Sequence, residues 1–160
     1  MATHPNAAAI ERFYRAFDAR DAATMNELYA PDATFSDPAF GTLDGEQVRA
    51  MWTMLTGQAD DLSIVASDVR ADDTSGSAHW QATYTFTATG RKVVNEIDAT
   101  FRFRDGKVVE HHDDFSFWRW SRQALGPAAL LLGWNPVGHA IVRRRARGQL
   151  EAFMRGGATP

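Results

Sequence analysis

Apolar residues recur at intervals of three and four in three early segments, which predicts helices through residues 7–20, 22–30 and 45–58. Asn6 and Asp21 stand where the first two helices would begin, and both residue types are good helix caps. Between the second and third segments, residues 33–38 alternate briefly and stop at Pro38, which indicates a short strand or a bend. The first third of the chain is therefore mainly helical.

After Gly57 the apolar period changes to two, which predicts four strands through residues 62–72, 77–90, 92–103 and 107–120. The last two are joined by an Asp105–Gly106 step, a strong hairpin signal. Helices followed by successive antiparallel strands indicate the α+β class, in which a curved sheet wraps around the helices.

The last forty residues return to helical spacing, which is broken at Gly126–Pro127 and at Asn135–Pro136. An apolar face is expected from Ala140, Ile141, Leu150 and Phe153, and a basic one from Arg143, Arg144, Arg145 and Arg147. We interpret this as an amphipathic helix docked on the domain with a solvated basic face; a surface for acidic partners or anionic lipid is the alternative. We therefore divide the chain into a main domain, residues 1–120, and a helical extension packed on it, residues 121–160.

Composition narrows the classes of function. The chain has 160 residues, enough for one domain with a substantial core, and a formal net charge of −3, which argues against nucleic acid as a partner. The absence of cysteine excludes disulfides, zinc thiolate sites and cysteine nucleophiles. There is no basic segment followed by an apolar run near the N-terminus, and the longest apolar run, residues 127–134, is too short to span a bilayer. We expect a soluble cytoplasmic protein.

Three stretches carry a resemblance to a known family: YAPDATFSDP at 29–38, GRKVVNEIDATFRF at 90–103 and DGKVVEHHDDF at 105–115. They resemble, in turn, the helix-to-strand segment, the hairpin strand and the final hairpin of the ketosteroid isomerase-like superfamily, which includes SnoaL-like and NTF2-like proteins. The resemblance implies a cone-shaped barrel of curved antiparallel sheet around N-terminal helices, with the C-terminal extension outside it. This scaffold hosts isomerases, dehydratases, cyclases, epoxide hydrolases and non-catalytic proteins.

In ketosteroid isomerases an aspartate base works with an oxyanion hole made of a tyrosine and a protonated aspartate. The resemblance places the base at Asp37, but the tyrosine falls on Phe13 and the second aspartate on Ala99. Tyr14 is one residue along, about 100° off that helix face, and Asp98 lies on the opposite face of its strand. One such donor can contribute ~3–4 kcal/mol to transition-state stabilisation, so we do not expect an ordinary steroid isomerase.

The run HHDD at 111–114 poses a question that the resemblance helps to answer. Along a strand, alternate side chains face opposite sides, and the resemblance turns His111, Asp113 and Phe115 toward the cavity and Glu110, His112 and Asp114 away. His111 and Asp113 would then have Cα atoms about 7 Å apart on one face. The neighbouring strands would add Trp80, Ala82, Tyr84, Phe86, Asn95, Ile97, Ala99 and Phe101, an apolar wall with few polar groups that is typical of a small-molecule site.

These residues suggest an acid–base enzyme without metal or organic cofactor, acting on a hydrophobic cyclic carbonyl compound by isomerisation, dehydration or aldol-type cyclisation. Asp37, desolvated in the cavity, would be the general base. His111, held by Asp113, would donate to the developing oxyanion, with Tyr84 as the reserve donor. Substrate would contact Phe13, Trp80, Tyr84, Phe86, Asn95, Ala99, Phe101 and Phe115.

Simpler interpretations stand beside this one. Asp37 before Pro38 could cap a turn, and His111 with Asp113 could be a buried structural pair. A metal site at HHDD is disfavoured because alternation splits the four residues across two faces and no third ligand is evident at suitable spacing.

The alternative function is a non-catalytic ligand-binding or assembly module. The outward face of the last predicted strand ends in Trp118 and Trp120, a possible homodimer interface. A cavity filled by Trp80, or by residues 125–134, would favour this alternative, whereas an extension that covers the mouth as a lid would favour the enzyme.

Overall fold

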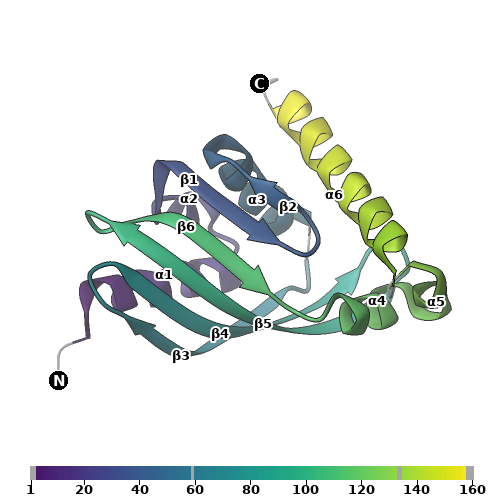
Figure 1. Ribbon diagram of the computed structural model, residues 1–160, viewed down its shortest axis with the longest axis horizontal. Coiled ribbons are helices and arrows are strands. Elements are labelled where there is room, and N and C mark those ends of the chain that lie inside the picture. The colour runs from purple at the N-terminus through teal and green to yellow at the C-terminus, as the bar shows by residue number, and fades with distance from the viewer. Residues whose placement is uncertain (1–2, 59, 133–134, 158–160) are drawn as a thin grey trace.

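A six-stranded sheet curves around the N-terminal helices in the order β2-β1-β6-β5-β4-β3 (Figure 1). The computed structural model describes residues 3–58, 60–132 and 135–157. The strands are β1 (Tyr29–Asp37), β2 (Gly41–Leu43), β3 (Ser63–Ala71), β4 (Ser75–Phe86), β5 (Arg91–Arg104) and β6 (Lys107–Asp114). The helices are α1 (Pro5–Asp18), α2 (Ala22–Asn26), α3 (Gly45–Gln58), α4 (Phe117–Leu125), the 3₁₀ turn η1 (Gly126–Ala128), α5 (Ala129–Leu132) and α6 (Pro136–Gly157). This confirms the predicted α+β class.

One pairing in the sheet departs from the expected antiparallel pattern, because β1 runs parallel to β6, with Phe35 opposite His111. The other neighbours are antiparallel. β1 is longer than predicted, since α2 ends at Asn26 and the strand already begins at Tyr29. The register shifts between Tyr29 and Thr34, and this irregularity accommodates Pro31, which has no backbone N–H for the ladder.

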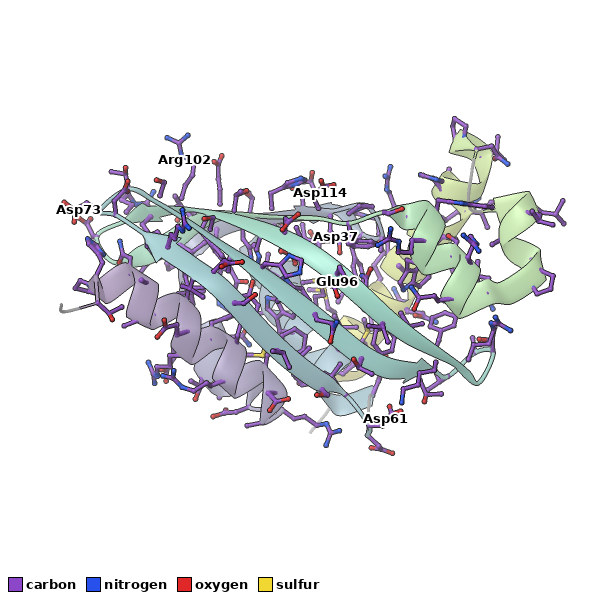
Figure 2. All side chains as sticks on the ribbon, turned by 90° about the horizontal axis from the view of Figure 1, so that it is seen from below. Asp37, Asp61, Asp73, Glu96, Arg102 and Asp114 are labelled. Carbon is purple, nitrogen blue, oxygen red and sulfur yellow. The ribbon has the colours of Figure 1, made fainter. Side chains whose placement is uncertain are left out.

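Strands β5 and β6 alternate between a buried and an exposed face. On β6, His111 and Asp113 are buried, while Glu110, His112 and Asp114 are exposed. This confirms the predicted orientation of the HHDD run. The outer face of the sheet is charged; Figure 2 labels Glu96, Arg102 and Asp114 on it, and Arg102 pairs there with Glu110.

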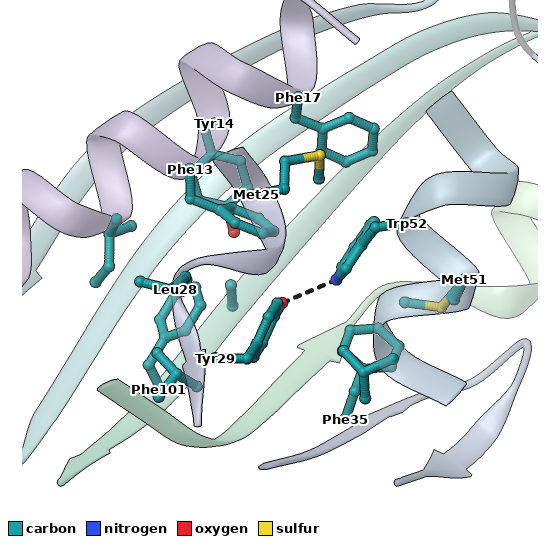
Figure 3. Packing of buried hydrophobic residues seen from close by; sticks show 14 of the residues in the cluster. Phe13, Tyr14, Phe17, Met25, Leu28, Tyr29, Phe35, Met51, Trp52 and Phe101 are labelled. Atoms are coloured by element: carbon teal, nitrogen blue, oxygen red, sulfur yellow. Dashed lines mark hydrogen bonds between the residues drawn. The ribbon is translucent and has the colours of Figure 1, made fainter. Parts of the chain in front are cut away.

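Aromatic rings fill the space between the helices and the sheet (Figure 3). The ring of Phe13 lies edge-on to those of Tyr14, Tyr29 and Trp52, with centroids 5.0, 5.9 and 5.5 Å away. Trp80 packs on the rings of Tyr14 and Phe17. Aromatic pairs of this kind contribute ~0.5–1.5 kcal/mol each beyond the area they bury, so this cluster fixes α1 and α3 against the sheet.

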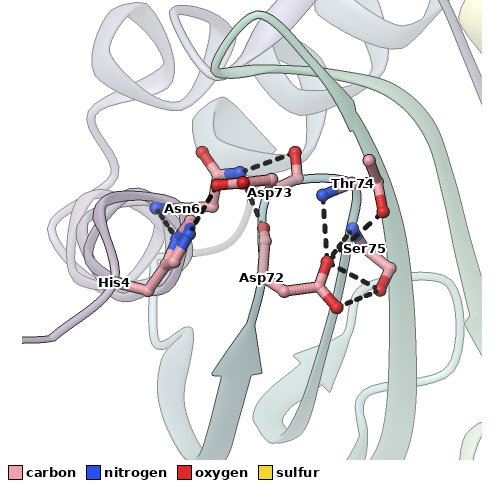
Figure 4. A network of polar contacts seen from close by, with 6 residues as sticks. All are labelled: His4, Asn6, Asp72, Asp73, Thr74 and Ser75. Atoms are coloured by element: carbon pink, nitrogen blue, oxygen red, sulfur yellow. Dashed lines mark hydrogen bonds and ion pairs between the residues drawn. The ribbon is translucent and has the colours of Figure 1, made fainter.

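The start of α1 differs from the prediction, which placed the cap at Asn6. The helix begins at Pro5, and the Nδ1 atom of His4 accepts the cap hydrogen bond from the Asn6 N–H. The Asn6 side chain is buried and donates to the carbonyl oxygen of Asp72 in the β3–β4 turn (Figure 4). Asn6 thus ties the helix to the sheet, a long-range role that local spacing does not reveal.

The last predicted strand ends early. β6 stops at Asp114, and Ser116 caps helix α4 by accepting a hydrogen bond from the Arg119 N–H. Phe117, Trp120 and Ala124 are buried at helical spacing, so the aromatic residues from Phe117 onward belong to a helix that lies on β5. Trp120 therefore faces inward, and the expected pair of outward tryptophans on a strand is wrong.

Helix α6 packs against α3, where Leu150 is buried and Phe153 partly buried. Ile141, which we placed on the apolar face, is 50% exposed instead. Arg147, which we placed on the solvated basic face, is half-buried and donates from one guanidinium nitrogen to the carbonyl oxygens of Phe40 and Thr42. The helix is therefore anchored to the β1–β2 hairpin through this arginine. Within the described residues, no helix combines the length and the apolar content that crossing a bilayer requires.

Candidate functional site

The inner wall of the sheet carries the side chains expected to line a cavity. Phe13, Trp80, Asn95, Ala99, Phe101, His111 and Asp113 are buried. Asp37, Tyr84, Phe86 and Phe115 are only partly buried. Of this second group, Tyr84, Phe86 and Phe115 pack against a small cluster at α4 made of Val93, Phe117, Trp120 and Ala124, and Tyr84 and Phe115 also contact the main core. The partly buried aromatic side chains of the interior thus lie at the end that α4 borders.

A chain of buried hydrogen bonds crosses the interior and ends on Asp113. The Trp52 Nε1–H donates to the Tyr29 hydroxyl at 2.9 Å, as Figure 3 shows. Tyr29 Oη lies 2.8 Å from His111 Nδ1, and His111 Nε2 lies 2.8 Å from Asp113 Oδ1. Because an indole N–H only donates and a carboxylate only accepts, the consistent assignment has the Tyr29 O–H donating to Nδ1 and the Nε2–H donating to Asp113.

This chain changes the role available to His111. Both ring nitrogens are engaged within the protein, so His111 holds Asp113 and has no free N–H for a substrate oxyanion. The sequence interpretation missed Tyr29 and Trp52. Tyr29 lies in the quoted YAPDATFSDP segment, but its inward direction depends on the β1–β6 pairing, which brings residues far apart in the chain together.

Asp37 lies at the end of β1, and the pKa of its carboxyl group departs strongly from the usual value. Its Oδ1 accepts a hydrogen bond from the Phe40 N–H at 2.6 Å, so the turn-capping interpretation applies. Burial nevertheless raises the pKa of Asp37 to about 7; the Phe40 hydrogen bond opposes that shift, and the negative charge of Asp113 adds to it. Asp37 and Asp113 are therefore two carboxyl groups in electrostatic contact, a pattern found where an acid and a base share one site.

Tyr14 also faces the interior, which corrects the expectation that it lies off the relevant helix face. It is buried, and its hydroxyl has no hydrogen-bond partner among the described residues. Burial and then the charge of Asp113 raise its pKa well above the usual value. The expectation failed because the curved sheet surrounds much of α1, so helix faces about 100° apart both meet the interior. The Trp80 Nε1–H beside it is likewise buried without a partner.

Tyr84 connects this end of the interior with α4. Its hydroxyl accepts a hydrogen bond from the Trp120 Nε1–H. Burial raises the pKa of Tyr84; the bond from Trp120 opposes that shift, and the charge of Asp37 adds to it. Tyr84 and Asp37 are thus electrostatically coupled, and the tyrosine keeps its own O–H for another acceptor.

The C-terminal helix also comes near Asp37, through Arg143. The charge of Arg143 lowers the pKa of Asp37, although this is the weakest of the influences on it. The Arg143 side chain also packs on Gly41, where φ is +73° and a Cβ atom would lie 3.1 Å from the arginine Cδ. The extension therefore borders the candidate site.

Comparisons with known proteins agree with this architecture. Residues 10–111 match the model of the SnoaL-like domain family, so the chain belongs to that family. A search of curated proteins gave no match.

Three solved structures illustrate the shared fold. IdmH of Streptomyces antibioticus, a proposed polyketide cyclase, is 24% identical with a TM-score of 0.63, over 75% of this chain and 98% of its own. An NTF2-like protein of unknown function from Burkholderia pseudomallei is 18% identical with a TM-score of 0.65, over 76% and 98%. An epoxide hydrolase of M. tuberculosis related to LEH is 18% identical with a TM-score of 0.65, over 81% and 96%. At these identities the similarity establishes an NTF2-like fold.

Proposed function

We propose that the chain is a cofactor-independent acid–base enzyme that moves a proton next to the carbonyl group of a hydrophobic cyclic compound, by isomerisation, dehydration or cyclisation. The observation that carries this proposal is the carboxyl of Asp37, whose pKa is raised to about 7, chiefly by burial and further by the charge of Asp113. A carboxyl that titrates near neutral pH can both take and return a proton, which is the requirement for a general acid–base.

In the proposed reaction, ionised Asp37 takes a proton from the carbon next to the carbonyl. The electron pair of the C–H bond moves to the carbonyl oxygen and forms an enolate. Protonated Asp37 then returns the proton to another carbon, or to a leaving hydroxyl group. Burial strengthens the hydrogen bonds that stabilise the enolate oxygen, because the local dielectric is low.

Hydrogen-bond donors for the enolate oxygen are available. The hydroxyl of Tyr14 and the indole N–H of Trp80 are buried donors with no partner in the part of the chain that the structure describes. The Tyr84 hydroxyl, which accepts from Trp120, can also donate its own O–H. An unpaired buried polar group costs ~1–3 kcal/mol, and a substrate oxygen would relieve that cost. We assign His111 to positioning Asp113, since its ring nitrogens are both engaged.

The known relatives support the class of chemistry only in outline. IdmH is a proposed polyketide cyclase, and a Xanthomonas campestris structure has the same proposed activity. An epoxide hydrolase also shares the fold. For that reaction we expect an Asp-Arg-Asp set, and Arg102 is exposed and paired with Glu110, so hydrolysis is the less supported choice.

The alternative is a non-catalytic ligand-binding or dimeric assembly module. Its specific support is the packing of Trp80 on Tyr14 and Phe17, which occupies interior space that a substrate would need. A further detail is the exposed, charged outer sheet face, which leaves a surface for a second copy.

The test follows the proton directly. Cyclic enones, hydroxyketones and polycyclic phenols are first screened by thermal shift, and the carbonyl compounds that bind are incubated with the protein in deuterated water. Mass spectrometry then measures deuterium uptake next to the carbonyl. We expect uptake with the wild type, at least a hundredfold slower uptake with Asp37→Asn, and an unchanged rate with Asp114→Asn.

Asp114→Asn is the matched control because Asp114 is the exposed neighbour of Asp113 on the same strand. Uptake that survives Asp37→Asn would remove Asp37 from the proposal. Ligands that bind without any uptake would favour the binding module, and sedimentation analysis would then show whether the chain dimerises.

A further inference from the structure

A second candidate site lies outside the interior, where α4 meets the start of β5. A surface hollow of about 470 Å³ is lined by Arg91, Lys92, Arg119, Arg122 and Gln123. Four of these five side chains are cationic, although the chain as a whole has a net charge of −3. The concentration of positive charge in one concave place indicates an anionic ligand.

The wall of this hollow is held by specific hydrogen bonds. The Gln123 side chain accepts from the Val94 N–H at 2.7 Å and donates to the Val94 carbonyl at 3.0 Å, which ties α4 to β5. The Arg91 Nε–H donates to the Gln123 carbonyl at 2.8 Å. The Arg91 guanidinium also packs on Gly126, where a Cβ atom would lie 2.9 Å from its central carbon and where φ is +61°. Arg91 therefore has a fixed position.

The cations of the hollow lack carboxylate partners. No ion pair within residues 3–58, 60–132 and 135–157 includes Arg91, Lys92, Arg119 or Arg122. Arg119 is within electrostatic reach of Glu96 and Lys92 within reach of Asp61. Those carboxylates accept hydrogen bonds from other groups, Glu96 from His79 and Gln81 and Asp61 from Thr85. Like charges gathered without an ion-paired carboxylate repel one another, and a bound anion would reduce that cost.

An apolar hollow of about 230 Å³ adjoins the cationic one and shares Arg91 and Arg122 with it. Its other walls include Trp118, Pro127, Ala129 and Leu130. The Arg122 guanidinium lies 5.9 Å from the centre of the Trp118 ring, a cation–π contact that orients it between the two hollows. Trp118 is 37% exposed and Leu130 65% exposed, so this apolar surface is open to a ligand.

We propose that the two hollows form one binding site for a soluble amphipathic anion, with a carboxylate or phosphate group among the arginines and an apolar chain against Trp118 and Leu130. Arginine suits both head groups because its planar fork of N–H donors matches their oxygens. The negative net charge of the chain opposes adsorption on an anionic bilayer, which favours a soluble molecule over a membrane surface.

Isothermal titration calorimetry tests the site with sodium octanoate and octyl phosphate, below the concentrations at which they form micelles. We expect saturable binding of one molecule per chain. The double variant Arg119→Gln/Arg122→Gln should weaken it at least tenfold, whereas Arg145→Gln should change it less than twofold. Arg145 is the matched control because it is exposed on α6 and has no ion pair among the described residues.

The same variants give outcomes that would overturn the proposal. If Arg145→Gln weakened probe binding as much as the double variant, the effect would come from the overall charge of the chain and not from this site. If inorganic phosphate bound as tightly as octyl phosphate, the apolar hollow would have no part in binding. If the chain bound neither probe but did bind phosphatidylglycerol vesicles, the site would be a membrane-binding surface instead. An NMR shift of the Trp118 indole N–H supports the site, whereas a shift of the Trp80 indole N–H that survives the double variant would place the probe in the interior.

Discussion

The indole nitrogen of Trp120 lies 2.8 Å from the hydroxyl oxygen of Tyr84 and donates a hydrogen bond to it. This one bond joins the first helix after the sheet to the partly buried end of the candidate site. Trp120 also packs against Phe86 and Phe117, with ring centroids 5.5 and 5.6 Å away. The C-terminal part of the chain is therefore connected to the site by a specific polar contact as well as by apolar packing.

Replacing Trp120 by Phe should lower the free energy of unfolding by about 1–3 kcal/mol. The substitution keeps an aromatic ring but removes the donor to Tyr84 and leaves unfilled volume. Urea unfolding measures the effect. Trp118→Phe is the control, because Trp118, on the same helix, is 37% exposed and its replacement should change the stability by less than about 0.5 kcal/mol. Equal effects of both substitutions would contradict the special role of Trp120.

The raised pKa of Asp37 predicts a specific pH dependence of stability. The pKa of Asp37 is about 7 in the folded protein, whereas the ordinary value is 3.8. The stabilising contribution of its carboxyl group is therefore complete at pH values below the lower of these two pKa values. That contribution is lost as the pH rises from about 4 to about 7, because the unfolded chain releases the proton first. Relative to Asp37→Asn, the wild type should lose roughly 2–4 kcal/mol over this interval.

Urea unfolding of both proteins across this pH range makes the comparison, and other titrating groups cancel in the difference. The amide oxygen of asparagine can still accept the hydrogen bond from the Phe40 N–H, so the turn is retained. If the stabilities of the two proteins changed in parallel, Asp37 would titrate normally and lose its place as the acid–base group.

Two tyrosine-to-phenylalanine substitutions should have opposite consequences. Tyr29→Phe leaves both the Trp52 indole N–H and the His111 Nδ1 without a buried partner, which should cost about 2–4 kcal/mol. Tyr14→Phe removes a hydroxyl that is already unpaired, so stability should be unchanged or slightly higher. Thermal and urea unfolding distinguish the two.

A Tyr14→Phe protein that is stable but binds the screened carbonyl compounds more weakly would identify its hydroxyl as a substrate donor, since functional groups are often kept at a cost in stability. Strong destabilisation by Tyr14→Phe would instead show that the hydroxyl has a structural partner.

Arg147→Ala should loosen helix α6 from the β1–β2 hairpin, because it removes the hydrogen bonds to the carbonyls of Phe40 and Thr42. Hydrogen–deuterium exchange should show faster exchange in residues 136–157 and little change in β5. Arg144→Ala is the control, since that side chain is exposed. Unchanged exchange in α6 would mean that burial of Leu150 alone holds the helix.

The sequence predicted the fold class well because helical and strand periods are local properties. The helical period placed α3 at residues 45–58. Alternation along one strand put His111 and Asp113 on the same face, and the family resemblance turned that face inward, where both are buried. The prediction was wrong where one stretch fits both a strand period and a helix period. The aromatic residues after Asp114 fit either a strand or a helix, and Ser116 decides for the helix through its hydrogen bond to the Arg119 N–H.

Other parts of the site depend on contacts that no local pattern contains. The inward direction of Tyr29 follows from the pairing of β1 with β6, and that of Tyr14 from the curvature of the sheet around α1. The position of Arg147 follows from the docking of α6 on the β1–β2 hairpin. The positions of these residues therefore became evident only when distant segments were placed together.

The parallel pairing of β1 with β6 has a consequence for how the chain is made. Ser36 and His112, neighbours across these strands, are 76 residues apart in the sequence. During synthesis β1 leaves the ribosome long before its partner, and its inner edge stays unpaired until residue 114 has emerged. Contacts between such distant segments slow folding, because a long loop must close before they form. The nascent chain thus carries an open strand edge while the whole segment between β1 and β6 is being made, and a chaperone that shields strand edges would protect it during that interval.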